Sequence, residues 1–216
     1  MSLTIHHLHL SQSDRILWLC EELSIPYTLK TYNRDKQTSL SPESYKELHP
    51  IGTAPIIQEG SITLGETNAI FEYILTKYGQ GRLVLSPDHP NYADYVFWLH
   101  HVQGTLQPAL NSTLTASEGD MMGQVMKARL NRSLDMMNSQ LKTNEYIAGD
   151  EFTAADCMMM FPLTTFRLFV PFSLEEYPFI VEYLHRISER EGYRVAMEKA
   201  DPGLARPITA VVNLNK

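Results

Sequence analysis

The stretch that decides the fold runs from Ala54 to Tyr78 and reads APIIQEGSITLGETNAIFEYILTKY. Two short apolar segments, APIIQEG and SITLGE, adjoin at Glu59 and Gly60, which is typical of a tight β-hairpin. From Thr67 onward the apolar residues recur at helical spacing instead, at Ile70, Phe71, Ile74, Leu75 and Tyr78. The stretch therefore predicts two antiparallel strands followed by a covering helix.

Two strand–helix units precede this stretch. Residues 3–10 alternate as a strand does, and residues 14–23 repeat apolar side chains at helical spacing. A second short strand is predicted over 27–32, and a helix over 41–48 with Ser41 as its N-cap. The order is β-α-β-α-β-β-α over roughly eighty residues, which predicts a four-stranded mixed sheet covered by helices.

The composition changes after this segment. Residues 80–91 are rich in Gly, Pro and Asp and are predicted to be a linker. Beyond them no strand pattern occurs, and helical spacing covers residues 92–115, 121–141, 153–170 and 178–191. The predicted class is α/β plus all-α, with an α/β domain over 1–79 and an all-helical domain over 92–216.

Composition excludes several classes of function. The 216 residues carry a formal net charge of −7, which disfavours nucleic acid and anionic membrane as partners. No apolar stretch reaches the roughly 20 residues of a membrane span, and no signal peptide is recognisable, so a cytoplasmic protein is expected. The two cysteines form no disulfide framework. His6, His7 and His9 lie in a strand pattern without ligand partners at zinc spacing, so no metal site and no cofactor are predicted.

Two motifs indicate a family. HPIGTAPII (residues 49–57) and GETNAIFEYI (residues 65–74) resemble segments of cytosolic glutathione transferases, and the resemblance extends over essentially the whole chain. It implies a thioredoxin-like N-terminal domain, a cis Ala54–Pro55 bond, and a helix start that binds the γ-glutamyl group. The family has serine at position 67 of this chain, where threonine stands. The glutathione-binding residues implied are Thr53, Ala54, Pro55, Glu66 and Thr67.

Two further patterns support the resemblance. AGDEFTAADCMMMFP (residues 148–162) contains Thr153 and Asp156 at capping-box spacing and resembles a folding motif of the family's helical domain. Near the N-terminus, Ser11 precedes Arg15 by four residues, as the catalytic serine does in serine-type members. The run RILWLCEEL is most similar to fungal (yeast-type) and bacterial theta-like members.

The serine would act on the sulfur of glutathione. A free thiol has a pKa near about 8.5, and lowering it by two units takes about 2.7 kcal/mol of preferential thiolate stabilisation. A hydroxyl and the positive end of the first helix can supply that, and Ser11 is the first candidate for this role. Ser13 is the alternative, either as the residue at sulfur or as a helix cap, and Arg15 is predicted to hold the turn.

The resemblance also implies the second substrate and the assembly. A hydrophobic electrophile would bind against the helical domain, near Trp98, His101 and Gln107. Glutathione would be the co-substrate, and the protein would be a homodimer. The predicted activity is glutathione S-transfer, with glutathione-dependent peroxide reduction as a further use of the same thiolate. The alternative is a non-catalytic glutathione-binding or interaction module.

A thiol transferase is the third reading and is disfavoured. It needs an exposed cysteine of low pKa at the turn before the first helix. Cys20 instead lies inside the predicted first helix on its apolar face, and Cys157 lies in a buried helix of the second domain. Both cysteines are therefore predicted to be structural.

Overall fold

A computed structural model describes residues 2–113 and 120–212 of the chain. The chain forms two compact units. Unit 1 comprises Met1–Arg82 and Glu189–Ala205, and unit 2 comprises Leu83–Ser188 and Arg206–Lys216. Part of the segment 92–216 thus belongs to unit 1. The ends of two predictions, residues 114–115 of the long helix and 213–216 of the helical domain, lie outside the described residues.

Unit 1 contains a four-stranded sheet in the order β2-β1-β3-β4. The strands are β1 Leu3–Leu8, β2 Tyr27–Tyr32, β3 Ile56–Glu59 and β4 Ile62–Leu64. Strand β1 pairs in parallel with β2 and antiparallel with β3, so that Ile5 faces both Leu29 and Ile57. Strands β3 and β4 form the predicted hairpin. The mixed sheet is therefore confirmed.

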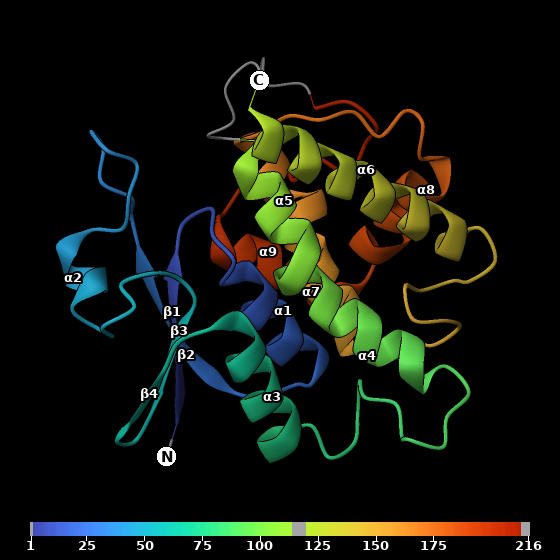
Figure 1. Cartoon of the computed structure of the whole chain (residues 1–216). Helices are drawn as coiled ribbons and strands as arrows, with labels where there is room; N and C mark the ends of the chain where they lie inside the picture. Colours follow the sequence, from blue (N-terminus) through green and yellow to red (C-terminus); the bar gives the residue numbers. More distant parts are fainter. Residues whose placement is uncertain (1, 114–119, 213–216) are drawn as a thin grey trace. The chain divides into compact units, whose positions relative to one another are not determined.

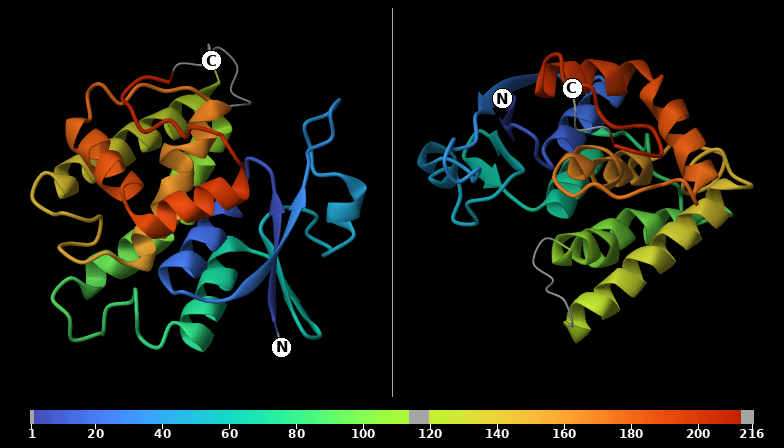
Figure 2. Two further views of the ribbon diagram at one scale, coloured as in Figure 1. Left: turned by 180° about the vertical axis from the view of Figure 1, so that it is seen from behind. Right: turned by 90° about the horizontal axis from the view of Figure 1, so that it is seen from above.

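Helices lie on both faces of this sheet. They are α1 Asp14–Glu22, α2 Glu43–Lys46 and α3 Thr67–Tyr78, while α9 Glu191–Ala200 belongs to the same unit. Helices α1 and α3 cover one face, and α2 lies on the other (Figure 1 and Figure 2). The prediction of Ser41 as the N-cap of α2 is wrong, because the cap is Pro42. The Pro42 carbonyl accepts the N–H groups of Tyr45 and Lys46, so the helix begins later than expected.

Helix α9 packs against α1, although the two are far apart in sequence. The guanidinium of Arg190 binds both carboxylate oxygens of Glu22, at 2.9 and 2.7 Å. The ring of Trp18 contacts that of Tyr193 edge to face, with centroids 5.2 Å apart. A Cβ at Gly192 would lie 2.8 Å from Glu22 Oε1, so a larger residue here would displace the Glu22 side chain. Together these contacts hold α9 in place along α1.

Unit 2 is helical. Its elements are α4 Tyr92–His101, the π-helical turn η1 Val102–Leu106, α5 Gln107–Ser112, α6 Met121–Leu141, α7 Ala154–Leu163, the 3-10 turn η2 Thr165–Leu168 and α8 Pro178–Ser188. The long helix predicted from residue 92 is thus interrupted. Pro108 has no N–H to donate to the carbonyl of Gly104, and the π turn spans this gap in the hydrogen-bond ladder.

Helix α7 is the core of unit 2. All ten of its residues are buried, and the predicted capping box between Thr153 and Asp156 is present at its start. Asp156 also accepts hydrogen bonds from the N–H of Ile147 and the hydroxyl of Tyr183. Among the described residues no helix has both the length and the apolar character needed to cross a bilayer.

Candidate active site

Two serine hydroxyls meet in the turn between β1 and α1. Ser11 Oγ lies 2.7 Å from Ser13 Oγ, and the backbone N–H of Ser13 also donates to Ser11 Oγ at 3.3 Å. Only 5% of Ser11 and 0% of Ser13 are exposed to solvent. Ser13 occupies the N-cap position of α1, but its hydroxyl makes no capping hydrogen bond. The hydroxyl of Ser13 is therefore committed to side-chain partners.

Gln12, between the two serines, ties this turn to α3. Its Oε1 accepts a hydrogen bond from the guanidinium of Arg15 and another from the hydroxyl of Thr67 at 3.3 Å. Arg15 thus holds the turn, as predicted, through an amide carbonyl. Burial lowers the pKa of Arg15 to about 10, while the charge of Asp14 raises it. Gln12 was not among the predicted site residues, although its place between the two candidate serines was a signal for it.

The start of α3 and the loop before β3 lie side by side. Glu66 is exposed and has φ 67°, a left-handed conformation that is uncommon for a residue with a side chain. Next to it, a Cβ at Gly65 would lie 3.1 Å from the side chain of Ile51. The Ala54–Pro55 bond is cis, as predicted. Unit 1 therefore presents the N-terminus of a twelve-residue helix beside this loop.

The glutathione-binding residues predicted from the resemblance differ in exposure. Thr53 and Glu66 are exposed, Ala54 is half-buried, and Pro55 and Thr67 are buried. The side chain of Ala54 packs against a cluster formed by Leu8, Tyr45 and Ile56, and so lies near the end of β1. The serine turn also follows β1. The structure therefore brings the serine turn and the start of α3 into contact through Gln12, and places the loop of Ala54 beside the same strand.

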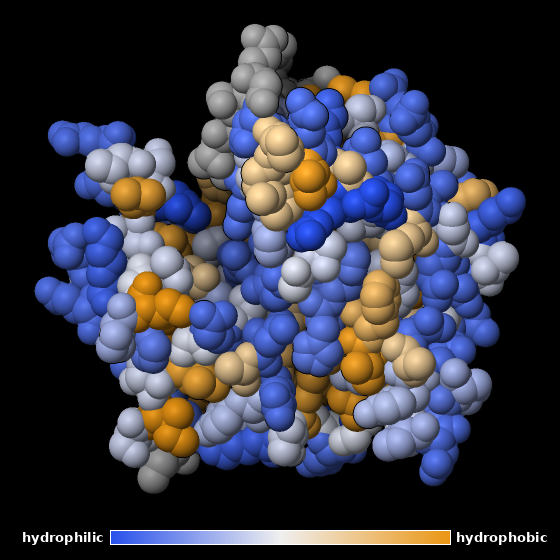
Figure 3. All heavy atoms as spheres, viewed as in Figure 1, coloured by the Kyte–Doolittle hydropathy of each residue, from blue (hydrophilic) through white to orange (hydrophobic). Residues whose placement is uncertain are grey.

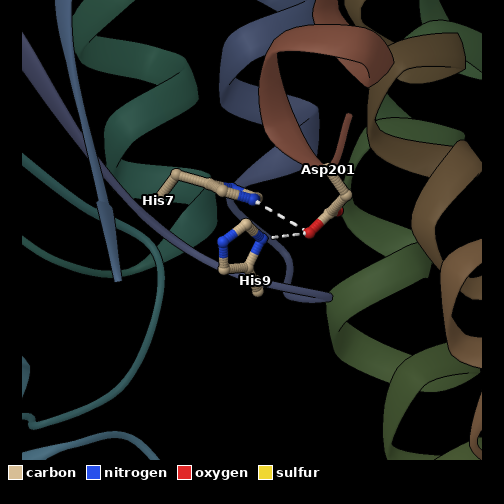
Figure 4. Close-up of side chains that lie close together, drawn as sticks. All are labelled: His7, His9 and Asp201. Atoms are coloured by element: carbon tan, nitrogen blue, oxygen red, sulfur yellow. Dashed lines mark hydrogen bonds and ion pairs between the residues drawn. The ribbon is translucent and has the colours of Figure 1, made fainter. Parts of the chain in front are cut away.

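A second polar cluster, formed by His7, His9 and Asp201 (Figure 4), adjoins the serine turn, since His7 is hydrogen-bonded to Ser13. His9 Nδ1 donates to Asp201 Oδ1 at 2.6 Å, and His7 Nε2 lies 3.6 Å from the same oxygen. Asp201 is the C-cap residue of α9 and also accepts the backbone N–H of Leu10 at 3.2 Å. No local pattern in the sequence predicts this carboxylate, because it comes from 192 residues beyond His9.

The spacing within this cluster is that of hydrogen bonding. The ligand atoms of His7, His9 and Asp201 all lie within 4.8 Å of one another, and these are residue types that bind metals. Two ligands about 2.0 Å from one tetrahedral zinc ion stand about 3.3 Å apart. The 2.6 Å between His9 and Asp201 is much shorter than that and fits a charge-assisted hydrogen bond.

The two cysteines are free and buried. Burial raises the pKa of the Cys20 thiol well above its ordinary value, and the nearby charge of Glu21 raises it further. A thiol in this environment is not ionised near neutral pH and is a poor nucleophile. Cys20 therefore cannot serve as a reactive thiol in the folded protein.

The residues predicted to bind the electrophile all lie in unit 2. Trp98 is buried and contacts the ring of His101 edge to face, at 5.4 Å between centroids. His101 Nε2 is hydrogen-bonded to the hydroxyl of Ser133 at 3.0 Å, and burial lowers the pKa of His101. Gln107 is buried separately, and its amide donates to Asn111. The structure thus brings Trp98 and His101 together but not Gln107.

A groove lined by both apolar and polar side chains runs beside Trp98, and its polar lining residues are Asp94, Asp135, Ser139 and Gln140. It lies between α4 and α6, and Phe97 and Met136 on its walls are 42% and 44% exposed. Figure 3 shows apolar side chains gathered on this face of unit 2, with polar ones around them. His101 stacks on Phe97 with ring centroids 5.0 Å apart. The groove therefore adjoins two of the three predicted residues.

Comparison with known proteins gives a consistent picture. Residues 11–77 match the model of the glutathione S-transferase N-terminal domain, and residues 97–191 match that of the C-terminal domain. Glutathione S-transferase 3 of Schizosaccharomyces pombe is 30% identical over 92% of this chain and 88% of its own length. Glutathione S-transferase 1 of Saccharomyces cerevisiae is 28% identical over 91% of this chain and 94% of its own.

Solved structures agree with the sequence comparison. The crystal structure of a glutathione S-transferase from Actinobacillus pleuropneumoniae matches with a TM-score of 0.84 and 32% identity, over 94% of each chain. A glutathione transferase from Methylococcus capsulatus matches with a TM-score of 0.77 at 18% identity, which bears on the fold alone.

Proposed function

The chain belongs to the glutathione S-transferase family, and from that premise we propose how its own residues bind and activate glutathione. It is a glutathione transferase, which transfers the sulfur of glutathione to an electrophile. We propose that it is of the serine type, with the hydroxyl of Ser11 donating to the thiolate. One observation carries this proposal: the buried hydroxyl pair of Ser11 and Ser13 is held by Gln12 against the start of α3.

Two features of this turn favour the thiolate over the thiol. The first is a hydroxyl at the N-terminal end of α1, where free N–H groups carry partial positive charge. The second is burial, since Ser11 is only 5% exposed and a hydrogen bond is stronger where water is excluded. Together they need to supply about 2.7 kcal/mol to lower the thiol pKa by two units.

The γ-glutamyl end of glutathione would bind at the start of α3. Its carboxylate would accept hydrogen bonds from the N–H and hydroxyl of Thr67, and its ammonium would pair with exposed Glu66. The backbone of Ala54, preceding Pro55, would pair with the cysteinyl part as an added strand does. Thr53, which is exposed beside it, would lie toward the glycine end. Thr67→Val removes the hydroxyl that would bind the carboxylate and also the hydrogen bond to Gln12 in the serine turn, so the KM for glutathione should rise and kcat should fall as well.

The electrophile would be hydrophobic and would bind against unit 2. We keep Trp98, His101 and Gln107 as the proposed residues. The exposed apolar side chains of Phe97 and Met136 in the groove beside Trp98 support the first two. His101→Gln should change the KM for electrophiles and leave that for glutathione unchanged. An organic hydroperoxide in place of the electrophile tests peroxide reduction by the same thiolate.

The assembly and location of the protein are also proposals. A homodimer and a cytoplasmic location are inferred from the family. Light scattering coupled to size-exclusion chromatography tests the first, and a fluorescent fusion in cells tests the second. A monomer that retains full activity would contradict the dimer proposal.

The central experiment is a titration of the bound glutathione thiol, followed by thiolate absorbance in the ultraviolet. We expect the wild-type protein to ionise the thiol well below about pH 8.5, and Ser11→Ala to raise that midpoint. Ser61→Ala, in the exposed β3–β4 turn, is the matched control and should leave it unchanged. If glutathione binds without any shift in the wild type, activation is wrong and a non-catalytic binding module is the better description.

A further inference from the structure

The hydroxyl pair of the serine turn is hydrogen-bonded to a buried histidine. Ser13 Oγ lies 2.8 Å from His7 Nδ1, and Ser11 Oγ lies 2.7 Å from Ser13 Oγ. His7 and Ser13 are 0% exposed and Ser11 is 5% exposed. Both distances are those of good hydrogen bonds. A continuous chain of three side chains therefore leads from Ser11 to His7.

The far side of His7 faces a carboxylate. Its Nε2 lies 3.6 Å from Asp201 Oδ1 and has no hydrogen-bond partner among the described residues. A carboxylate attracts an N–H, so the proton of the neutral imidazole belongs on Nε2. Nδ1 is then an acceptor, which takes the hydroxyl proton of Ser13. Ser13 Oγ in turn accepts from the hydroxyl of Ser11.

Asp201 is held in place for this role. Its Oδ1 accepts from His9 at 2.6 Å and from the backbone of Leu10 at 3.2 Å, and the packing of α9 on α1 positions the helix that carries it. Figure 4 shows both imidazoles directed at this one carboxylate. Arg34 adds positive charge to this region, since its guanidinium donates to the carbonyl oxygens of His9 and Leu10 and interacts electrostatically with Asp201, while Asp14 and Arg15 follow Ser13 at the start of α1.

We propose that His7 is the proton acceptor for the glutathione thiol, reached through Ser13 and Ser11, with Asp201 stabilising the imidazolium. This inference rests on the proposed placement of the thiol beside Ser11. In the step, the S–H bond breaks and its electron pair stays on sulfur. The thiol proton passes to Ser11 Oγ, the Ser11 proton to Ser13 Oγ, and the Ser13 proton to His7 Nδ1. The products are a thiolate and an imidazolium whose Nε2–H faces Asp201.

The same transfer reverses the direction of each hydrogen bond in the chain, so that every donor becomes an acceptor. Before it, Ser11 donates to Ser13 and Ser13 donates to His7, so the hydroxyl of Ser11 has no proton left for sulfur. After it, His7 donates to Ser13, Ser13 to Ser11, and Ser11 to the thiolate. One chain of groups thus both removes the proton and stabilises the thiolate that remains, which a lone serine cannot do. His7 acts through the serines and is a positioning residue with respect to the substrate.

The first test uses variants of His7 and Asp201 that keep the approximate shape of the side chain but cannot take part in proton transfer. His7→Asn keeps an acceptor near Nδ1, and Asp201→Asn keeps an oxygen for His9 and Leu10. Both should bind glutathione with an affinity close to that of the wild type, yet ionise its thiol nearer to about pH 8.5. For His7→Asn, kcat/KM should fall about a hundredfold at about pH 6.5, and the loss should shrink above about pH 9. If the role of His7 were only structural, His7→Asn would lower the activity equally at both pH values.

The matched control is the neighbouring histidine of the same strand. His6 is also buried, but its ring is bonded to Tyr32 and Gln58 instead of the serine turn. His6→Gln should leave the midpoint of the bound thiol unchanged. If His6→Gln shifts it as much as His7→Asn does, the shift reflects general disturbance of β1 and the relay is wrong.

The second test counts protons. Glutathione is mixed with the protein in weakly buffered indicator solution, and the protons released are compared with the thiolate absorbance that appears. The relay keeps the proton inside the protein, so the wild type should release far less than one proton per thiolate formed. His7→Asn should release one proton per thiolate at alkaline pH. One proton per thiolate in the wild type would overturn the relay.

The two proposals fail in different ways. If the wild type forms no thiolate, or if neither Ser11→Ala nor Ser13→Ala alters it, the proposed function fails and the relay fails with it. If the wild type forms thiolate that depends on a serine but His7→Asn leaves its midpoint unchanged, the relay alone fails.

Discussion

Replacing Asp156 by asparagine is the sharpest test of how unit 2 is held together. The carboxylate is buried and accepts four hydrogen bonds. Oδ1 accepts from the N–H of Ile147 and the hydroxyl of Tyr183, both at 2.9 Å. Oδ2 accepts from the N–H and the hydroxyl of Thr153, at 2.8 and 3.2 Å. An asparagine side chain offers an acceptor on only one of these two sides.

The expected loss follows from the donors that remain. With its oxygen toward Ile147 and Tyr183, the asparagine side chain directs its NH2 group at Thr153. The Thr153 hydroxyl can rotate to accept, but the Thr153 N–H stays buried without a partner, which costs about 1–3 kcal/mol. Asp156→Ala leaves all the donors unmatched and adds a cavity, so about 3–5 kcal/mol is expected. That is a large part of the roughly 5–15 kcal/mol that a folded protein has.

The pKa of Asp156 also predicts how the stability difference between the wild type and Asp156→Asn changes with pH. Burial raises the pKa of Asp156 to about 6, although the hydrogen bonds from Ile147, Thr153 and Tyr183 lower it. The folded value exceeds the ordinary 3.8, so the group favours folding most below about pH 4, and this contribution is lost as the pH rises through about 6. Asparagine does not titrate here. The stability gap between the wild type and Asp156→Asn should therefore narrow from about pH 4 to about pH 7.

Urea unfolding followed by tryptophan fluorescence measures both effects. Asp150→Asn, at an exposed aspartate of the loop before α7, is the matched control and should change stability by less than about 0.5 kcal/mol. If Asp156→Asn is as mild as the control, the four hydrogen bonds do not hold the start of α7. A gap that widens with pH would mean that the hydrogen bonds outweigh burial.

Three further predictions use other buried or paired groups. Hydrogen bonds from Lys77 and two tyrosine hydroxyls lower the pKa of Glu59 from 4.5 to about 2. The stability that Glu59 contributes is therefore complete above about pH 4.5 and is lost toward about pH 2. As the pH is lowered over that range, Tm should fall more for the wild type than for Glu59→Gln. Cys20 and Cys157 are buried, so a thiol reagent should label neither until the protein is unfolded, and rapid labelling of the native protein would contradict their burial. The buried guanidinium of Arg167 donates to three backbone carbonyls, so Arg167→Met should destabilise the protein by about 3 kcal/mol or more in chemical unfolding, and a neutral result would show that water replaces it.

Local patterns predicted the elements whose signals are local. Helix α3 begins at Thr67 and ends at Tyr78 as its apolar spacing indicated, and the capping box of Asp156 was readable from four consecutive residues. Where a single proline interrupts a periodic pattern, the helix boundary differs from the predicted one. Pro42 delayed the start of α2, and Pro108 forced a π turn into what the spacing predicted as one helix.

Contacts between distant segments could not be predicted from such patterns. The sequence offered His7 and His9 without a carboxylate at ligand spacing, because Asp201 comes from the far end of α9. Its position depends on the ion pair between Arg190 and Glu22, which no periodicity encodes. The link between Gln12 and α3 is of the same kind, since 55 residues separate its two ends.

Sequence spacing alone also could not decide whether Ser11 or Ser13 contacts the sulfur, and the structure shows that the two hydroxyls are coupled. Their hydroxyls are 2.7 Å apart, so removing one alters what the other can donate. Ser13→Ala leaves Ser11 free to donate to sulfur but cuts its path to His7, whereas Ser11→Ala removes the donor at sulfur and leaves Ser13 bonded to His7. If the relay operates in the proposed order, Ser13→Ala must share the pH profile and the proton release of His7→Asn. Ser11→Ala must then lose thiolate stabilisation at every pH, because no hydroxyl remains at sulfur to replace it.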